Sequence, residues 1–315
     1  MNDVPVDFGL GVSAAPAMTF LDDLFAAGLL VPSGVAGLYG RAKAFEDVVD
    51  AIRAMVGRAG AADGAEEFSF PPAMARQTFE ESGYLRGFPQ LAGSVHAFCG
   101  DDSGHREILR CMEVNEDWTA QQQATDIVLT PAACYPIYPV MAARGTLPEN
   151  GRTADMFSYC FRREPSLEPT RMQLFRIREY VRIGTPAQVS AFREMWMERA
   201  PLMFQSMGLP FEIDVANDPF FGRVGKLKAS GQRDQELKFE LLVPVNSTAH
   251  PTACCSFNAH LDHFSQVWDL RLQSGERAHT GCVGFGLERI ALALFRHHGL
   301  NSAAWPTGVR TALWP

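Results

Sequence analysis

The chain has 315 residues, of which 47% are hydrophobic and 20% charged, enough for one large domain with an appendage or for two small domains. Its formal net charge of -8 and the lack of a basic arm argue against a nucleic-acid partner, so tRNA binding is not expected. No apolar run reaches the roughly 18 residues of a membrane span, and seven irregularly spaced cysteines predict a reducing, cytoplasmic location.

Residues 18–59 are predicted to be mostly helical. The first run carries apolar residues at helical spacing: Leu21, Leu24, Phe25, Leu29 and Leu30. A second amphipathic run covers residues 42–59, and Pro32, Gly34 and Gly37 separate the two runs.

An Ala/Gly-rich stretch, residues 59–65, predicts a loop after this helical part. We therefore divide the chain into a short helical N-terminal segment, residues 1–67, and a main domain, residues 68–315. The main domain opens with an extended piece that holds a double proline, Pro71-Pro72, followed by a helix. From residue 92 to 140, short β-rich runs alternate with polar turns.

The centre of the chain has the pattern of a β-hairpin. Residues 156–164 are β-like, and residues 174–184 alternate apolar and charged side chains after a polar loop. A helix is expected over 186–208, a strand over 238–245 and a strand-to-helix unit over 281–298. Because strands and helices do not alternate as regular βαβ units, the sequence predicts an α+β fold with a mainly antiparallel sheet.

The first motif with chemical meaning is Phe161-Arg162-Arg163-Glu164. If this piece is a strand, Arg162 and Glu164 share one face. The arginine can then grip a phosphate, and the glutamate can accept a hydrogen bond from a base amino group. The alternative is a surface ion pair between neighbouring strands.

The second motif is the glycine-rich stretch that begins at Gly281. Gly281, Gly284 and Gly286 would let a strand pass close under a ligand, and Arg289 in the first turn of the next helix suits a triphosphate. The spacing fits neither a dinucleotide fingerprint nor a P-loop. The alternative is a helix packed on a thin strand with a surface arginine.

Together and in this order, the two motifs resemble the catalytic domain of class II aminoacyl-tRNA synthetases. FRRE resembles their second motif, GCVGFGLER the third, and FPPAMARQTF the first, which builds the dimer interface in that family; the resemblance covers residues 68–300. It implies a synthetase-like sheet flanked by helices and a homodimer. Within it, LFRIREYVRIG and KFELLVPVNSTAHPTACCSFN look most like seryl-type enzymes.

The resemblance implies an ATP site. Arg162 would bind the α-phosphate and the amino acid carboxylate, Arg289 the γ-phosphate, and Glu164 adenine. Tyr180 matches best the aromatic residue that stacks on adenine, and Phe175 is the second candidate.

The resemblance also places Glu240 near ATP and Mg²⁺, and Ala253 and Ser256 at the amino acid. The stretch from His250 to Ser256 departs from the seryl pattern, which has a glutamate before a serine pair. The magnesium ligands therefore stay open.

A third set of residues could bind a metal. Cys134, Glu179 and Cys282 are competent Zn²⁺ ligands that leave one position open, although buried cysteines are usually inert. An atypical zinc-dependent seryl-type branch has Cys, Glu and Cys at these places, and there the metal binds the substrate amino group. His260 and His263 flank Asp262 and could suggest a metal, but we expect that aspartate only to orient a histidine.

Only about 67 residues precede the first motif, too few for the tRNA-binding domain of a seryl enzyme. This shortness resembles amino acid:[carrier protein] ligases, which load glycine or alanine onto the phosphopantetheine thiol of a small acidic carrier protein. The resemblance implies ATP-dependent formation of an aminoacyl-adenylate, followed by thioester formation. The alternatives are seryl-type tRNA aminoacylation with a separate tRNA-binding partner, and an inactive regulatory paralogue.

A cationic segment could bind the carrier protein. Residues 220–228 place three cations, Arg223, Lys226 and Lys228, beside two aromatic residues, Phe220 and Phe221, in an otherwise acidic chain, which suits an acidic helix. The alternative is a solvated charge run next to a buried phenylalanine.

Overall fold

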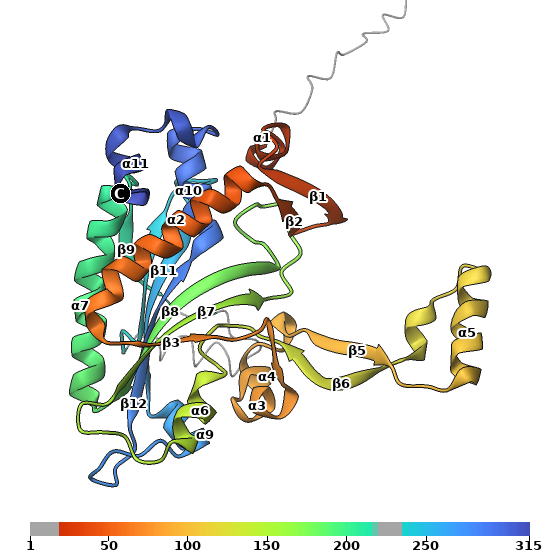
Figure 1. Ribbon diagram of the computed structural model, residues 1–315, viewed down its shortest axis with the longest axis horizontal. Coiled ribbons are helices and arrows are strands. Elements are labelled where there is room, and N and C mark those ends of the chain that lie inside the picture. The colour runs from red at the N-terminus through yellow and green to blue at the C-terminus, as the bar shows by residue number, and fades with distance from the viewer. Residues whose placement is uncertain (1–18, 217, 219–234) are drawn as a thin grey trace, which may run out of the picture.

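The computed structural model describes residues 19–216, 218 and 235–315, and its centre is a seven-stranded sheet (Figure 1). In spatial order the strands are β3 (Glu66–Ser69), β7 (Arg152–Phe161), β8 (Leu174–Gly184), β12 (His279–Gly286), β11 (Thr252–Leu261), β10 (Lys238–Val243) and β9 (Glu212–Val215). All neighbouring pairs are antiparallel except β3 and β7, which are parallel. The predicted α+β fold with a mainly antiparallel sheet is confirmed.

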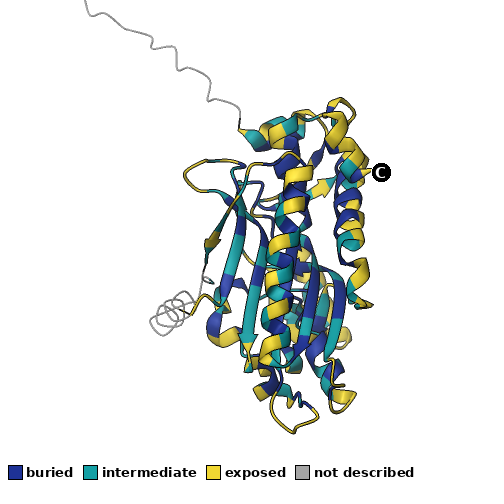
Figure 2. Cartoon of the chain, turned by 90° about the vertical axis from the view of Figure 1, so that its left-hand side faces the viewer, coloured by how far each residue is buried: buried dark blue, intermediate teal, exposed yellow. Residues whose placement is uncertain are grey.

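Three long helices cover one face of this sheet: α2 (Lys43–Gly60), α7 (Pro186–Ser206) and α10 (Leu287–His298). Helix α7 begins with a capping box, in which Thr185 and Gln188 bond each other's backbone N–H groups. The main hydrophobic core lies between these helices and the strands, and Figure 2 shows the exposed residues on the outer sides of the helices. The short helix α11 (Thr307–Leu313) packs against α2 and α7.

The N-terminal part is only partly helical. Helix α1 (Phe20–Ala26) ends before Leu29, because Gly28 has a φ of +66° and the Leu29 N–H turns back to bond the Leu24 carbonyl. The hairpin of β1 (Leu30–Val35) and β2 (Leu38–Arg41) follows, so the helical prediction is wrong for Leu29 and Leu30. Helix α2 shares the main core with the sheet, so this segment packs as part of the body.

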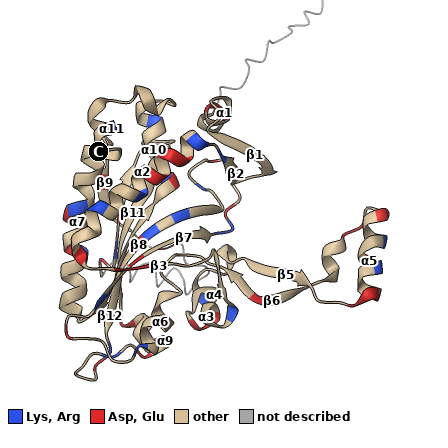
Figure 3. Cartoon of the chain, in the orientation of Figure 1, with Lys and Arg blue, Asp and Glu red and all other residues tan. Residues whose placement is uncertain are grey.

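A three-stranded arm projects from the body (Figure 1). It consists of β4 (Ala73–Ala75), β5 (Ser94–Phe98) and β6 (Gln122–Leu129), with α5 (Asp102–Glu113) at its tip and α3 (Arg76–Glu81) and α4 (Tyr84–Gly87) at its base. The sequence predicts only strands and turns over residues 92–140, whereas Asp101 caps the helix α5 by accepting from the Ser103 and Gly104 N–H groups. Figure 3 shows charges of both signs on this helix.

Two further helices, α6 (Ile137–Ala143) and α9 (His263–Trp268), pack beside the sheet around a second, smaller core. Single 3₁₀ turns complete the structure: Ala61–Asp63, Pro89–Leu91, Trp118–Gln121 and Ser302–Ala304. Among the described helices, none is both long and apolar enough to cross a membrane.

Candidate active site

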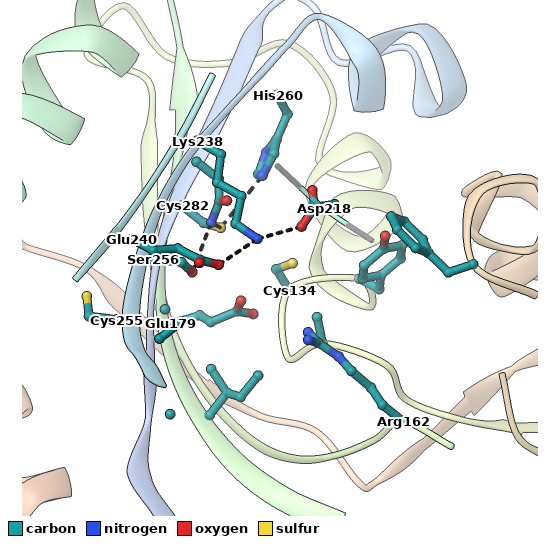
Figure 4. A pocket seen from close by; sticks show the side chains of 18 of the residues that line it. Cys134, Arg162, Glu179, Asp218, Lys238, Glu240, Cys255, Ser256, His260 and Cys282 are labelled. Atoms are coloured by element: carbon teal, nitrogen blue, oxygen red, sulfur yellow. Dashed lines mark hydrogen bonds and ion pairs between the residues drawn. The ribbon is translucent and has the colours of Figure 1, made fainter. Parts of the chain in front are cut away.

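A cavity opens on the face of the sheet that the long helices leave free (Figure 4). Strands β8, β10, β11 and β12 form its floor, and the segment between β6 and α6 forms one wall. Most of the site residues expected from the sequence line it: Cys134, Arg162, Phe175, Glu179, Glu240, Ala253, Ser256, Cys282 and Arg289.

Tyr180 is a correction to the predicted site. Successive side chains on a strand point to opposite faces, so Tyr180 faces the helices while Glu179 faces the cavity. The Tyr180 ring is buried and lies 4.9 Å from the Trp196 ring of α7. Phe175 lies on the cavity side of the same strand, so it is the aromatic residue of the two that can meet a nucleotide.

Arg162 and Glu164 do not share a strand face, which is a second correction. Strand β7 ends at Phe161, and both residues lie in the loop that follows. Arg162 enters the cavity, with its Nε donating to the Pro131 carbonyl at 3.2 Å. Glu164 pairs with Arg171 at 3.6 Å and is not among the residues that line the cavity.

Two arginines, Arg162 and Arg289, line the cavity. The Arg289 side chain is held by hydrogen bonds to two backbone carbonyls. Its Nε donates to the Thr170 carbonyl and a terminal nitrogen donates to the Ala253 carbonyl, both at 3.0 Å. Burial lowers the pKa of Arg289, and the charge of Arg162 lowers it further. The two cations are therefore close enough to repel each other, and a polyanion between them would relieve the repulsion.

Cys134, Glu179 and Cys282 form a cluster suited to a metal ion. Their ligand atoms lie within 4.8 Å of one another, and all three residues are buried. In the described part of the chain, Glu179 Oε2 is buried without a hydrogen-bond partner. A buried oxygen without a partner is costly, and a bound cation would provide one. Two sulfurs and a carboxylate are ligands that suit a divalent cation such as Zn²⁺.

Burial and neighbouring groups shift the pKa values of Cys134, Glu179 and Cys282, which are called the metal cluster below. Burial and the charge at Cys282 raise the pKa of the Glu179 carboxyl to about 8. A hydrogen bond between the two sulfurs lowers the pKa of Cys282 and raises that of Cys134. A bound cation would stabilise all three anionic forms at once.

Gly284 and Gly281 face opposite sides of β12. A Cβ at Gly284 would lie 3.3 Å from Glu179 Oε1, so this glycine leaves room for the carboxylate in the cavity. A Cβ at Gly281 would lie 2.8 Å from Val189 of α7 and from the Asn258 carbonyl. Gly281 therefore serves the packing of a helix, and the expectation that it lies under a ligand is wrong.

Sequence reasoning missed three polar residues of the cavity, Asp218, Lys238 and Asn258, and it gave His260 no role in the site. Lys238 is buried and pairs with Asp218 at 2.6 Å and with Glu240 at 2.9 Å. Period-two spacing could have revealed part of this set, because Ser256, Asn258 and His260 follow one another on the cavity side of β11. The expected carrier-binding residues Phe221, Arg223, Lys226 and Lys228 lie outside the described residues.

The chain is similar to a known protein family and to two known enzymes. Residues 118–298 match the family described as tRNA synthetase class II core domain (G, H, P, S and T). Amino acid–[acyl-carrier-protein] ligase 1 of Bradyrhizobium diazoefficiens is 48% identical over 89% of this chain and 86% of its own length. Ligase 2 of the same organism is 47% identical over 96% and 90%.

More distant relatives share the fold. The type-2 serine–tRNA ligase of Methanopyrus kandleri is 27% identical over 77% of this chain, which spans 50% of that enzyme. The crystal structure of M. kandleri SerRS in complex with A. aeolicus tRNASec superimposes with a TM-score of 0.80 at 20% identity, over 94% of this chain and 60% of that one.

Proposed function

Because the chain belongs to the amino acid–[acyl-carrier-protein] ligases, a family with the class II tRNA synthetase core, we propose that it activates a small amino acid with ATP and transfers it to a carrier protein. Glycine is the favoured substrate and alanine the second. The observation that carries the proposal is that one cavity holds Arg162, Arg289 and the metal cluster together.

We propose that Cys134, Glu179 and Cys282 hold Zn²⁺. When bound, the ion supplies a Lewis acid that can take up a neutral α-amine at an open position. Such a site selects α-amino acids as a class, and the size of the remaining cavity then separates glycine and alanine from larger substrates.

Activation joins the substrate carboxylate to ATP. Arg162 would bind the carboxylate and the α-phosphate, and Arg289 would bind the γ-phosphate. The carboxylate oxygen attacks the α-phosphorus, the bond to the β-phosphate oxygen breaks, and pyrophosphate leaves with its electron pair. The two guanidinium groups stabilise the developing charge. Phe175 would stack on adenine, Glu164 would accept from its amino group, and Glu240 would lie beside the Mg²⁺ of ATP.

Transfer then moves the aminoacyl group to the phosphopantetheine thiol of an acidic carrier protein. The thiolate attacks the adenylate carbonyl, and AMP leaves as a thioester forms. Asp218 supports a docking role for the cationic segment that contains Arg223 and Lys226. It lines the cavity, pairs with Lys238, and directly precedes that segment in the sequence.

The test is amino-acid-dependent exchange of labelled pyrophosphate into ATP, with each amino acid and with or without a zinc chelator. We expect exchange with glycine or alanine and its loss in chelator. Exchange with no amino acid would favour an inactive paralogue. A second assay offers phosphopantetheinylated carrier protein and tRNA in parallel, and labelled tRNA would favour the tRNA ligase alternative.

Charge reversal tests the docking segment. The double variant Arg223→Glu and Lys226→Glu should lose carrier loading and keep pyrophosphate exchange, because docking charges act after adenylate formation. A double variant at Lys43 and Arg310, two exposed cations on α2 and α11, makes the same change in net charge and should keep both activities. Loss of loading in both variants would contradict a specific docking segment.

We also propose that the chain forms a homodimer in the cytoplasm. The dimer would use the first motif, whose residues form β4 and α3 at the base of the arm. The seven cysteines, all within the described ranges, are unpaired, which supports a reducing compartment. Light scattering on the purified protein tests the dimer, and a monomer mass at micromolar concentration would contradict it.

A further inference from the structure

The sulfur of Cys282 is approached by two side-chain nitrogens from the neighbouring strand β11. Asn258 Nδ2 lies 3.4 Å from the sulfur. His260 Nε2 lies 3.6 Å from it (Figure 4). Asn258 is the register partner of Cys282, so its position follows directly from the pairing of the strands. The same nitrogen lies 3.2 Å from Ser256 Oγ, which fixes the amide.

His260 has its other ring nitrogen fixed as well. His260 Nδ1 lies 3.1 Å from Thr280 Oγ1 and 3.5 Å from the Tyr138 hydroxyl. A hydroxyl that donates to Nδ1 leaves the ring proton on Nε2, which then donates to the sulfur. Thr280 is fully buried on the same strand as Cys282, so solvent does not compete for this contact.

The backbone is distorted where it presents this histidine. The pairing of β11 with β12 runs from Ala259–Gly281 to Leu261–Thr280, so His260 is an extra residue in a β-bulge. Leu261, directly after it, has a φ of +52°, an uncommon conformation for a leucine. Bulges and strained residues of this kind occur next to functional sites, where they re-aim a side chain.

We propose that His260 and Asn258 are positioning residues for the metal site, and that Thr280 fixes the tautomer of the histidine. Their N–H groups orient the Cys282 sulfur toward Cys134 and neutralise part of its charge. This inference rests on the proposed metal site. It extends that site from three ligands to a hydrogen-bond chain that runs from Thr280 through His260 to the sulfur.

The test uses metal binding rather than catalysis. Metal-free protein is titrated with Co²⁺, whose thiolate charge-transfer band reports the sulfur, and Zn²⁺ affinity is measured by competition with a chelator. His260→Phe keeps a ring against Phe264, 5.0 Å away, and removes both nitrogens. His260→Gln keeps an N–H donor, and Thr280→Val keeps the shape of the threonine without its hydroxyl.

We expect His260→Phe to weaken Zn²⁺ binding by about 10–100-fold and to move the Co²⁺ band to longer wavelength, since the sulfur then donates more charge. His260→Gln should restore most of the affinity and the band position. Thr280→Val should shift the band in the same direction by less. The thermal midpoint of each metal-free variant shows whether it is folded, and Thr280→Val carries the test if His260→Phe is not.

Three results would overturn the proposal. Unchanged affinity and band position in His260→Phe would show that the histidine does not act on the sulfur. Loss of a nitrogen ligand from the Co²⁺ spectrum in that variant would make His260 a ligand instead. If the unaltered protein binds neither Co²⁺ nor Zn²⁺, the proposed metal site itself is wrong. This result is seen without any variant, so it differs from the first two results, which concern only the role of His260.

Discussion

Adjacent residues of the third motif should respond to substitution in opposite ways. Glu288 is 2% exposed and accepts two hydrogen bonds from Arg176, one from its backbone N–H and one from Nε, both at 2.7 Å. Arg41 lies 3.5 Å from the same carboxylate. Arg289, one residue later, points into the cavity. We therefore expect Glu288→Ala to destabilise the fold and Arg289→Ala to impair the use of ATP.

The magnitudes follow from the contacts. Removing one partner of a buried ion pair costs about 3–5 kcal/mol. Arg176 keeps a second partner in Glu46, whose side chain is 31% exposed, so the lower end of that range applies to Glu288→Ala. Arg289→Ala removes two hydrogen bonds from a charged group, worth about 1.5 kcal/mol each at the low end, but it also ends the cost of burying this cation beside Arg162, so a net loss of about 2 kcal/mol is expected. The two alanine variants should therefore differ in their free energy of unfolding by at least about 1 kcal/mol.

Urea denaturation, followed by tryptophan fluorescence, measures these free energies, and pyrophosphate exchange measures activity. Glu288→Gln is the matched control, since it keeps the shape and loses only the charge; about 2 kcal/mol is expected. If Glu288→Ala and Arg289→Ala lose equal stability, or if Arg289→Ala keeps the wild-type KM for ATP and kcat, the assignment of separate roles is refuted.

Three further predictions concern residues of the site predicted from the sequence. Serine at both Cys134 and Cys282 should remove bound zinc, measured by metal analysis of purified protein, and should abolish pyrophosphate exchange; retained metal would contradict the cluster. Phe175→Ala should raise the KM for ATP, because stacking on a base is worth about 1–3 kcal/mol. Tyr180→Phe should leave that KM unchanged, and Tyr180→Ala should lower the free energy of unfolding by about 3–5 kcal/mol; a reversed pattern would restore Tyr180 to the nucleotide site.

The regular parts of the fold could be predicted from sequence because their signals are local. Strand β8 occupies the predicted residues 174–184, and α7 and α10 lie within the predicted ranges 186–208 and 281–298. Helix α5 could not be predicted as easily. It sits on a projecting arm and buries only Cys111, so it lacks the burial of a packed helix, although Ile108, Leu109 and Met112 do give it an apolar side. The hairpin after α1 was missed because the short apolar run over 29–30 fits the period of a helix and that of a strand equally well.

Site residues could be predicted where they belong to a family motif. They could not be predicted where the tertiary structure decides which way the side chain points. Arg162, Arg289 and the metal cluster were expected, and the structure brings them together. Tyr180 was misplaced because the sequence alone does not show which face of strand β8 lies against the core and which faces the cavity. His260 was given no role in the site because its contact with Cys282 depends on the pairing of β11 with β12, which the sequence does not show.

The metal cluster depends on strand register more than on any single contact. Glu179 lies opposite Gly284 on β12, and Cys282 lies on the same face two residues earlier. A slip of one residue between β8 and β12 would turn the sulfur or the carboxylate toward α7. Gly284 adds the space that lets the carboxylate lean toward the sulfurs, since a Cβ there would lie 3.3 Å from Glu179 Oε1. The packing of the helix side therefore holds the ligands in place, because Tyr180 and Val283 in the main core fix the register that brings Glu179 and Cys282 together.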